Sequence, residues 1–304
     1  MDGWQRAANR IYDGKQRMIK SPKVEDWLSF MDRVGIEKTV LYPTAGLAHG
    51  LISNASWSNA LAEGYNSWLL ARYCQSNHQR IKGVALLPLQ DIKSACKQLR
   101  HIHSQDGIVG VCITAVNLST LPLLGHEYYF PLYELACELN CMIGIHGAPT
   151  VGLGLDGLDD FAAVHALSHP FAQIRQCASM IMGGIFEKFP TLRVAFLEGG
   201  IEWIPFLLGR LDEEYAKRKV NISSSPTEQI RKSSTYFICE LGEKLIPKVA
   251  GLIGNDKIIS TSDFPHEPAN EYGEVLKEFM KRDDLTPDLK QAILYDNAKK
   301  LYSF

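Results

Sequence analysis

No segment of this sequence is long and apolar enough to suggest a membrane helix. Its apolar runs stay well short of the about 18 residues that a span requires, and the residues from Met1 to Arg6 lack the apolar stretch of a secretory signal. Neither sign of charge is in excess, because 32 Lys and Arg residues stand against 34 Asp and Glu residues. The basic excess that is typical of nucleic-acid-binding proteins is therefore missing. We expect neither a membrane nor a nucleic acid as partner.

The cysteines are too irregularly spaced for a disulfide framework. Their number, seven, is odd, and no short spacing repeats among them. We interpret them as buried thiols rather than as metal ligands, which indicates a reducing compartment and predicts a cytoplasmic protein. They stand at positions 74, 96, 112, 137, 141, 177 and 239.

A glycine-rich phosphate loop, a linker and an internal repeat are also missing. Gly152-Leu153-Gly154 is not followed by the third glycine of a dinucleotide-binding turn. A chain of 304 residues with 46% apolar residues can bury a large core, and a single α/β barrel needs about 250 residues. We therefore predict one domain over residues 1–304, with an atypical N-terminal segment at 1–25.

What the sequence does contain is a regular alternation of short apolar runs and helical patterns. The runs are apolar almost throughout, as in parallel strands that are covered on both faces. A barrel of alternating strands and helices is the nearest architecture, and a doubly wound open sheet is the alternative. We expect strands at 38–43, 81–87, 108–114, 141–146, 192–198, 235–240 and 257–263, and helices at 56–77, 91–103, 129–140, 171–189, 203–217 and 271–302, the last broken at Pro287.

Three of the expected strands end in a polar residue that could bind a metal. These residues are His146, Glu198 and Asp263, and each follows an apolar run. A charge buried there needs a partner or a metal, and the active residues of α/β barrels lie at the carboxyl ends of the strands. Each residue alone is also compatible with a structural role, as a bonded histidine, a capping acid or a turn aspartate. Their equivalent positions favour a common site.

Two segments around these residues resemble the amidohydrolase-related family. Ser262-Asp263-Phe264-Pro265-His266 is similar to the signature of that family's last barrel strand. The segment 189–205, which contains Glu198, is similar to the family's sixth-strand motif, and segments 31–37 and 296–298 add weaker similarity. The resemblance runs from about Asp26 to the C-terminus.

The resemblance implies a distorted (β/α)8 TIM barrel with one divalent metal, zinc or else manganese. His146 and Asp263 match metal ligands of the family. Glu198 stands where many members have a histidine, which leaves it as ligand, base or substrate-orienting acid, so we predict Asp263 and Glu198 as catalytic residues. His266 is a candidate for substrate binding, and so is His169, which we expect in the long loop after His146.

The family's first strand, with its pair of histidines, has no counterpart in this sequence. The first histidine is His49, which follows the first recognisable strand. His101-Ile102-His103 has the spelling of the pair but lies at a helix end, where histidine is favoured by the helix dipole. We therefore predict a barrel that lacks its first strand and stays open or loosely covered, with edges at 38–43 and 257–263.

From these features we predict a metal-dependent hydrolase that acts on a small, carboxylate-bearing substrate. A non-oxidative decarboxylase of the same family is the first alternative. An inactive remnant or scaffold, which has lost the ligands of the first strand, is the second. We further expect a homodimer.

Overall fold

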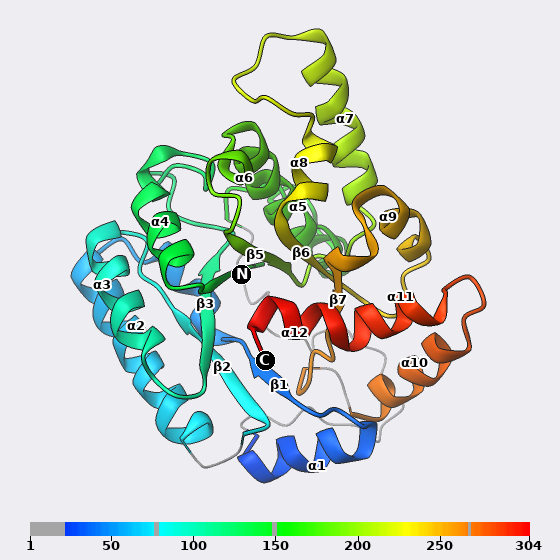
Figure 1. The fold of residues 1–304 in the computed structure, drawn as a ribbon. Coiled ribbons are helices and arrows are strands. Elements are labelled where there is room, and N and C mark those ends of the chain that lie inside the picture. The colour runs from blue at the N-terminus through cyan, green and yellow to red at the C-terminus, as the bar shows by residue number, and fades with distance from the viewer. Residues whose placement is uncertain (1–21, 76–78, 148–150, 267–268) are drawn as a thin grey trace.

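A computed structural model describes residues 22–75, 79–147, 151–266 and 269–304. Its centre is a sheet of seven parallel strands in the order β1 to β7, and the helices surround this sheet (Figure 1). The strands are β1 Thr39–Leu41, β2 Ile81–Leu86, β3 Ile108–Thr114, β4 Met142–His146, β5 Arg193–Leu197, β6 Ser234–Cys239 and β7 Ile258–Ser260. Each of the seven expected strands is thus present.

Helices precede the first strand, occupy the connections between successive strands and follow the last strand. The α-helices are α1 Val24–Val34, α2 Ala55–Leu69, α3 Ile92–His103, α4 Phe130–Glu138, α5 Phe161–Met182, α6 Ile185–Lys188, α7 Ile204–Lys217, α8 Pro226–Lys232, α9 Ile246–Ile253, α10 Ala269–Lys281, α11 Pro287–Gln291 and α12 Asn297–Tyr302. Shorter 3-10 and π segments are η1 Ala45–Leu51, η2 Leu70–Cys74, η3 Glu127–Tyr129, η4 Asn255–Lys257 and η5 Ala292–Asp296.

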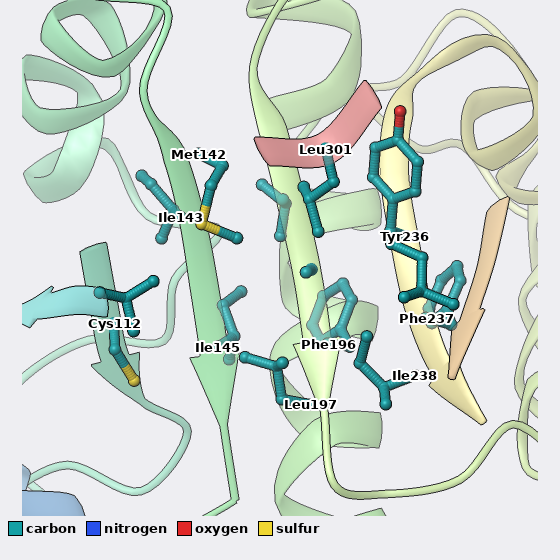
Figure 2. Close-up of a cluster of buried hydrophobic side chains, with 14 of the residues drawn as sticks. Cys112, Met142, Ile143, Ile145, Phe196, Leu197, Tyr236, Phe237, Ile238 and Leu301 are labelled. Atoms are coloured by element: carbon teal, nitrogen blue, oxygen red, sulfur yellow. The ribbon is translucent and has the colours of Figure 1, made fainter. Parts of the chain in front are cut away.

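The middle of the sheet forms the core of the molecule. Every residue of β4 and β5 is buried, which explains why these strands read as continuous apolar runs. Figure 2 shows Ile143 and Ile145 of β4 beside Phe196 of β5 and Phe237 of β6, with the Phe196 and Phe237 rings stacked 5.5 Å apart. A rigid, dry core of this kind fixes the ends of the strands that emerge from it.

The sheet curls around this core without closing into a complete barrel. Within the described residues β1 pairs only with β2, and β7 only with β6, so both are edges. The expected TIM barrel without one strand is confirmed. At the open side, the Phe30 ring of α1 stacks on Phe264, which follows β7, at a distance of 4.2 Å.

The C-terminal helix α12 covers the amino-terminal ends of the strands. Arg193, the first residue of β5, donates hydrogen bonds to the carbonyl oxygens of Lys300 and Leu301. Leu301 is fully buried and lies among the core side chains in Figure 2. Lys38, which precedes β1, has its Nζ 5.0 Å from the centre of the Phe304 ring. This end of the molecule is therefore closed, and an active site has to lie at the other end.

One expected element is placed differently. We predicted His165 and His169 in a loop, but α5 begins at Phe161 and carries both. Pro170 lies inside this helix. Because proline normally interrupts a helix, the expected helix began only after Pro170, and the turns of α5 before it were not predicted. The N-terminal segment up to residue 21 lies outside the described residues, and the assignment of 1–304 to one domain stays a prediction.

Candidate active site

The three polar residues expected at strand ends lie at one edge of the sheet. His146 is the last residue of β4, Glu198 directly follows β5, and Asp263 follows β7 by three positions. All seven strands are parallel, so their carboxyl ends share one edge. This is the edge at which α/β barrels build their active sites.

The two acids share an uncommon backbone conformation. Glu198 has a φ of 60° and Asp263 a φ of 47°, both in the left-handed region. A residue with a side chain is held there at a cost of about 1–3 kcal/mol, and such residues cluster at functional sites. The conformation turns each chain sharply at the end of its strand, which directs the loop away and leaves the carboxylate at the edge.

His146 and Glu198 are in direct contact. The distance from His146 Nε2 to Glu198 Oε2 is 2.8 Å, and the two side chains are 9% and 22% exposed. The other ring nitrogen, Nδ1, is 2.8 Å from the carbonyl oxygen of Gly147. Because a carbonyl only accepts, Nδ1 carries a proton and donates it. Nε2 therefore faces Glu198 with a second proton of its own, with a proton donated by the Glu198 carboxyl group, or with a cation between them.

His169 approaches the same carboxylate from α5. Its Nε2 is 3.9 Å from Glu198 Oε1, and its Nδ1 is 3.0 Å from the hydroxyl of Ser168. Gly147 makes this approach possible, because a Cβ atom at Gly147 would lie 2.0 Å from His169 Cδ2. The site thus brings together His146, Glu198 and His169.

Asp263 and His266 form a second pair, at the open side of the sheet. His266 Nδ1 is 2.9 Å from Asp263 Oδ1, and His266 Nε2 is 3.1 Å from the hydroxyl of Thr44. Thr44 follows β1 and His266 follows β7, so this chain of contacts spans the two edge strands. His266 thereby joins the loops on either side of the gap.

Two contributors were missed at the level of sequence. Thr44 follows the first strand, and the rule that singled out the other strand ends could have found it. Gln173 lies fully buried on α5 and donates to the carbonyl oxygens of Ile145 and Leu197, at 3.1 and 2.7 Å. It ties the ends of β4 and β5 together beneath the His146–Glu198 pair. A glutamine inside a helix gives no signal of such a role.

The donors at this edge are of the kinds that a divalent metal binds. Imidazole nitrogen and carboxylate oxygen are both present, and a histidine that ligates a metal commonly donates its other N–H to a carbonyl, as His146 does to Gly147. In the described ranges, however, no group of three or more His, Cys, Asp and Glu side chains is placed to hold a metal ion. The residues are of the kinds that bind a metal, and His146 is oriented as a ligand would be. Too few such side chains lie together, however, to form a complete metal site.

This chain belongs to the amidohydrolase family, whose sequence model matches residues 23–304. The resemblance seen in the two motifs is therefore confirmed. Membership places the chain in a family of enzymes, in agreement with the fold and with the polar residues at the strand ends.

Two curated relatives and a solved structure are decarboxylases. The chain is 27% identical to a 2-amino-3-carboxymuconate-6-semialdehyde decarboxylase of Dictyostelium discoideum, over 69% of this chain and 61% of that protein. It is 23% identical to a gamma-resorcylate decarboxylase of Polaromonas sp., over 98% and 90%. A dihydroxybenzoic acid decarboxylase of Polaromonas sp. JS666, solved with manganese and 2-nitroresorcinol, shares the fold with a TM-score of 0.75, at 20% identity and with 91% and 85% coverage.

These similarities correct the predicted reaction. The prediction of a hydrolase is wrong, because the two curated relatives named above are decarboxylases. The manganese in the solved structure agrees with the predicted divalent metal of the family, and zinc stays a prediction. Within the described residues no helix could cross a membrane.

Proposed function

We propose that this chain is a metal-dependent decarboxylase of a small aromatic or unsaturated acid. The observation that supports this most is the contact between His146 Nε2 and Glu198 Oε2, at 2.8 Å, at the carboxyl edge of the sheet. The names of the relatives supply the reaction class and the type of acid, since one acts on gamma-resorcylate and another on a carboxymuconate semialdehyde. This chain spans only 61% of the length of the carboxymuconate-semialdehyde decarboxylase.

We assign His146 and Asp263 as metal ligands, with Glu198 beside them. A divalent ion held there, zinc or manganese, would supply a Lewis acid that polarises the oxygens of a substrate carboxylate. The open side of the sheet, between β1 and β7, is where further ligands would have to enter, since it is the place of the missing strand.

Glu198 and Asp263 are the residues that we assign to proton handling. Decarboxylation breaks one carbon–carbon bond, leaves its electron pair on the substrate carbon, and replaces CO2 by one proton. Glu198 Oε1 faces His169 Nε2, so this oxygen is placed to hold the proton that the carbon receives. His169 and His266 lie beside the two carboxylates and are the residues that we assign to substrate binding.

The cytoplasmic location and the homodimer are part of the proposal. The odd, unpatterned cysteines, all of them free thiols in the described structure, support a cytoplasmic location. Sedimentation analysis of the purified chain would test the dimer.

The test of the proposed function is release of CO2 from gamma-resorcylate by the full chain in the presence of Mn²⁺. We expect CO2 and resorcinol in equal amounts, at a rate that falls when a chelator is added. An inactive remnant, the alternative from the sequence, predicts neither product with any of the acids that the relatives use. Failure to release CO2 from these acids at saturating Mn²⁺ would contradict the proposal.

A further inference from the structure

Two loops beside the site are held together by crossed carboxylates. Glu243, in the loop between β6 and α9, accepts hydrogen bonds through Oε1 from the backbone N–H groups of Ile201 and Glu202, at 2.7 and 3.2 Å. Glu202, in the loop between β5 and α7, accepts in turn through Oε1 from the N–H groups of Lys244 and Leu245, at 2.9 and 3.2 Å. We call this arrangement the Glu202–Glu243 clasp.

Each carboxylate of the clasp lies at the start of the other loop's helix. Leu245 directly precedes α9, and Glu202 lies two positions before α7. A negative charge is stabilised at a helix N-terminus, where backbone N–H groups are unpaired. The clasp therefore satisfies donors at both helix starts, and Glu243 Oε2 also accepts from the N–H of Glu240 at 2.8 Å.

The clasped segment begins directly after the candidate catalytic acid. Glu198 is followed by Gly199 and Gly200, and Gly200 has a φ of 61°. A Cβ atom at Gly200 would lie 2.6 Å from Glu243 Oε1, so only glycine lets Glu243 reach the N–H groups beyond it. The absence of a side chain at Gly200 thus allows the Glu243 carboxylate to lie against the backbone two residues after Glu198.

Glu198 is consequently fixed from both sides. Before it, Gln173 donates to the carbonyl oxygen of Leu197 at 2.7 Å; after it, Glu243 holds Ile201 and Glu202. A left-handed φ of 60° at Glu198 is unfavourable and persists only where the surroundings impose it. Gln173 and Glu243 hold the backbone on either side of this residue.

We propose that Glu243 is a positioning residue, which holds the loop after β5 so that Glu198 meets His146. It acts through the backbone and contacts neither the substrate nor the reacting atoms. The role rests on the proposed function only in so far as Glu198 is catalytic. The holding of the loop itself can be measured without any turnover.

The experiment compares Glu243→Gln with Glu228→Gln in the full chain. Glutamine keeps the size of the side chain but replaces the carboxylate by a neutral amide with one acceptor oxygen. The N–H groups of Ile201 and Glu202, which share Oε1, then keep only a neutral acceptor, and the N–H of Glu240 faces the NH2. Glu228 is an exposed acid of α8 that pairs with Lys232, which makes it a matched control. The readouts are amide hydrogen exchange at Ile201 and Glu202, and kcat and KM separately for gamma-resorcylate with Mn²⁺.

For Glu243→Gln we expect exchange at Ile201 and Glu202 to be about tenfold faster than in the Glu228→Gln control, because a neutral amide oxygen is a weaker acceptor than the carboxylate it replaces. We also expect kcat to fall about tenfold with little change in KM, since misplacing a catalytic group affects the reacting state more than substrate binding. Unchanged exchange, or a kcat equal to that of the control, would overturn the role of Glu243. If the unaltered chain has no activity, the proposed function fails, while the exchange result still decides on the clasp.

Discussion

Glu198 is the residue on which the chemistry of this site converges. It contacts His146 at 2.8 Å, lies 3.9 Å from His169, and is held in a left-handed backbone conformation. A carboxylate between two imidazoles can accept or return a proton with little movement. Because both contacts are with imidazole nitrogens, the charge of Glu198, rather than its size, determines its role in proton transfer.

Glu198→Gln should therefore remove activity and preserve the fold. We expect kcat/KM for decarboxylation to fall by about 100-fold or more, the usual range for the loss of an acid–base group. The melting temperature should change little, because glutamine fills the same space. Glu134→Gln, at an exposed position of α4, is the control. Activity of Glu198→Gln close to that of the control would show that Glu198 has no role in proton transfer.

Asp263 is expected to act through the metal. In Asp263→Asn we predict a loss of most bound Mn²⁺ and a fall in kcat/KM of about 100-fold or more, since an amide is a far weaker ligand than a carboxylate. Asp283→Asn, at an exposed position after α10, should bind as much metal as the unaltered chain. The measurement is metal content after dialysis, by elemental analysis. Equal occupancy in both variants would rule out Asp263 as a ligand.

At the scale of elements, the site depends on close contacts between strands and the helices that follow them. The end of β4 and the helix α5 meet where Gly147 faces His169. This contact brings a side chain from the interior of a 22-residue helix up to the His146–Glu198 pair.

Gly147→Ala should disturb the site through His169 alone. Its added methyl would lie 2.0 Å from the imidazole, so the ring has to move away. We expect kcat/KM to fall about tenfold, because a displaced binding group costs on the order of 1–2 kcal/mol. Gly157→Ala, later in the same connection and with open space around its Cβ, should leave kcat/KM unchanged. A similar kcat/KM for both variants would mean that His169 has no part in binding.

The clasp also predicts a pH dependence of stability. Burial raises the pKa of Glu243 from 4.5 to about 7, although the N–H groups of Ile201, Glu240 and Glu202 lower it in part and the charge of Glu240 raises it. Since the folded-state pKa is the higher one, protonation favours the folded state. This contribution is complete below about pH 4.5 and is lost as the pH rises through about 7.

The measurement is the free energy of unfolding of the unaltered chain and of Glu243→Gln at pH 8 and at pH 5. We expect the unaltered chain to gain stability relative to the variant at pH 5, by up to about 3 kcal/mol. A relative gain at pH 8 would contradict the sign. Glu240, whose charge acts on Glu243, and Arg282, which donates to the Glu243 carbonyl oxygen, are present in both proteins, so their titration cancels to a first approximation.

The elements themselves were predictable to different degrees. The strands could be predicted from the sequence, because parallel strands that are buried on both faces appear as apolar runs such as Met142–His146. Helix α5 was not predicted in full, because Pro170 suggested a break where the structure continues the helix. Gln173 and Glu243 were out of reach of the sequence, since their roles come from hydrogen bonds to backbone groups 24 and 42 positions away. Strand ends can be found from a pattern; the partners that fix them depend on the fold.

At the scale of the whole molecule, the open side of the sheet and the C-terminal helix define where chemistry can occur. Helix α12 fills the amino-terminal end through Leu301 and the hydrogen bonds that Arg193 donates to it, so the carboxyl edge is the accessible one. There the Thr44–His266–Asp263 chain of contacts spans the gap between β1 and β7. The molecule thus combines a complete core with a site that is bordered by two edge strands.

The measurement that tests decarboxylation most directly is turnover of carboxyl-¹³C-labelled gamma-resorcylate in D2O with Mn²⁺. A decarboxylase releases the label as ¹³CO2 and leaves resorcinol with one deuterium at the carbon that carried the carboxyl group, which mass spectrometry and NMR detect together. We predict both signals, in equal amounts, and the loss of both in Glu198→Gln. Substrate that keeps its label after prolonged incubation, or labelled CO2 produced equally by Glu198→Gln, would contradict the function and the site described for this chain.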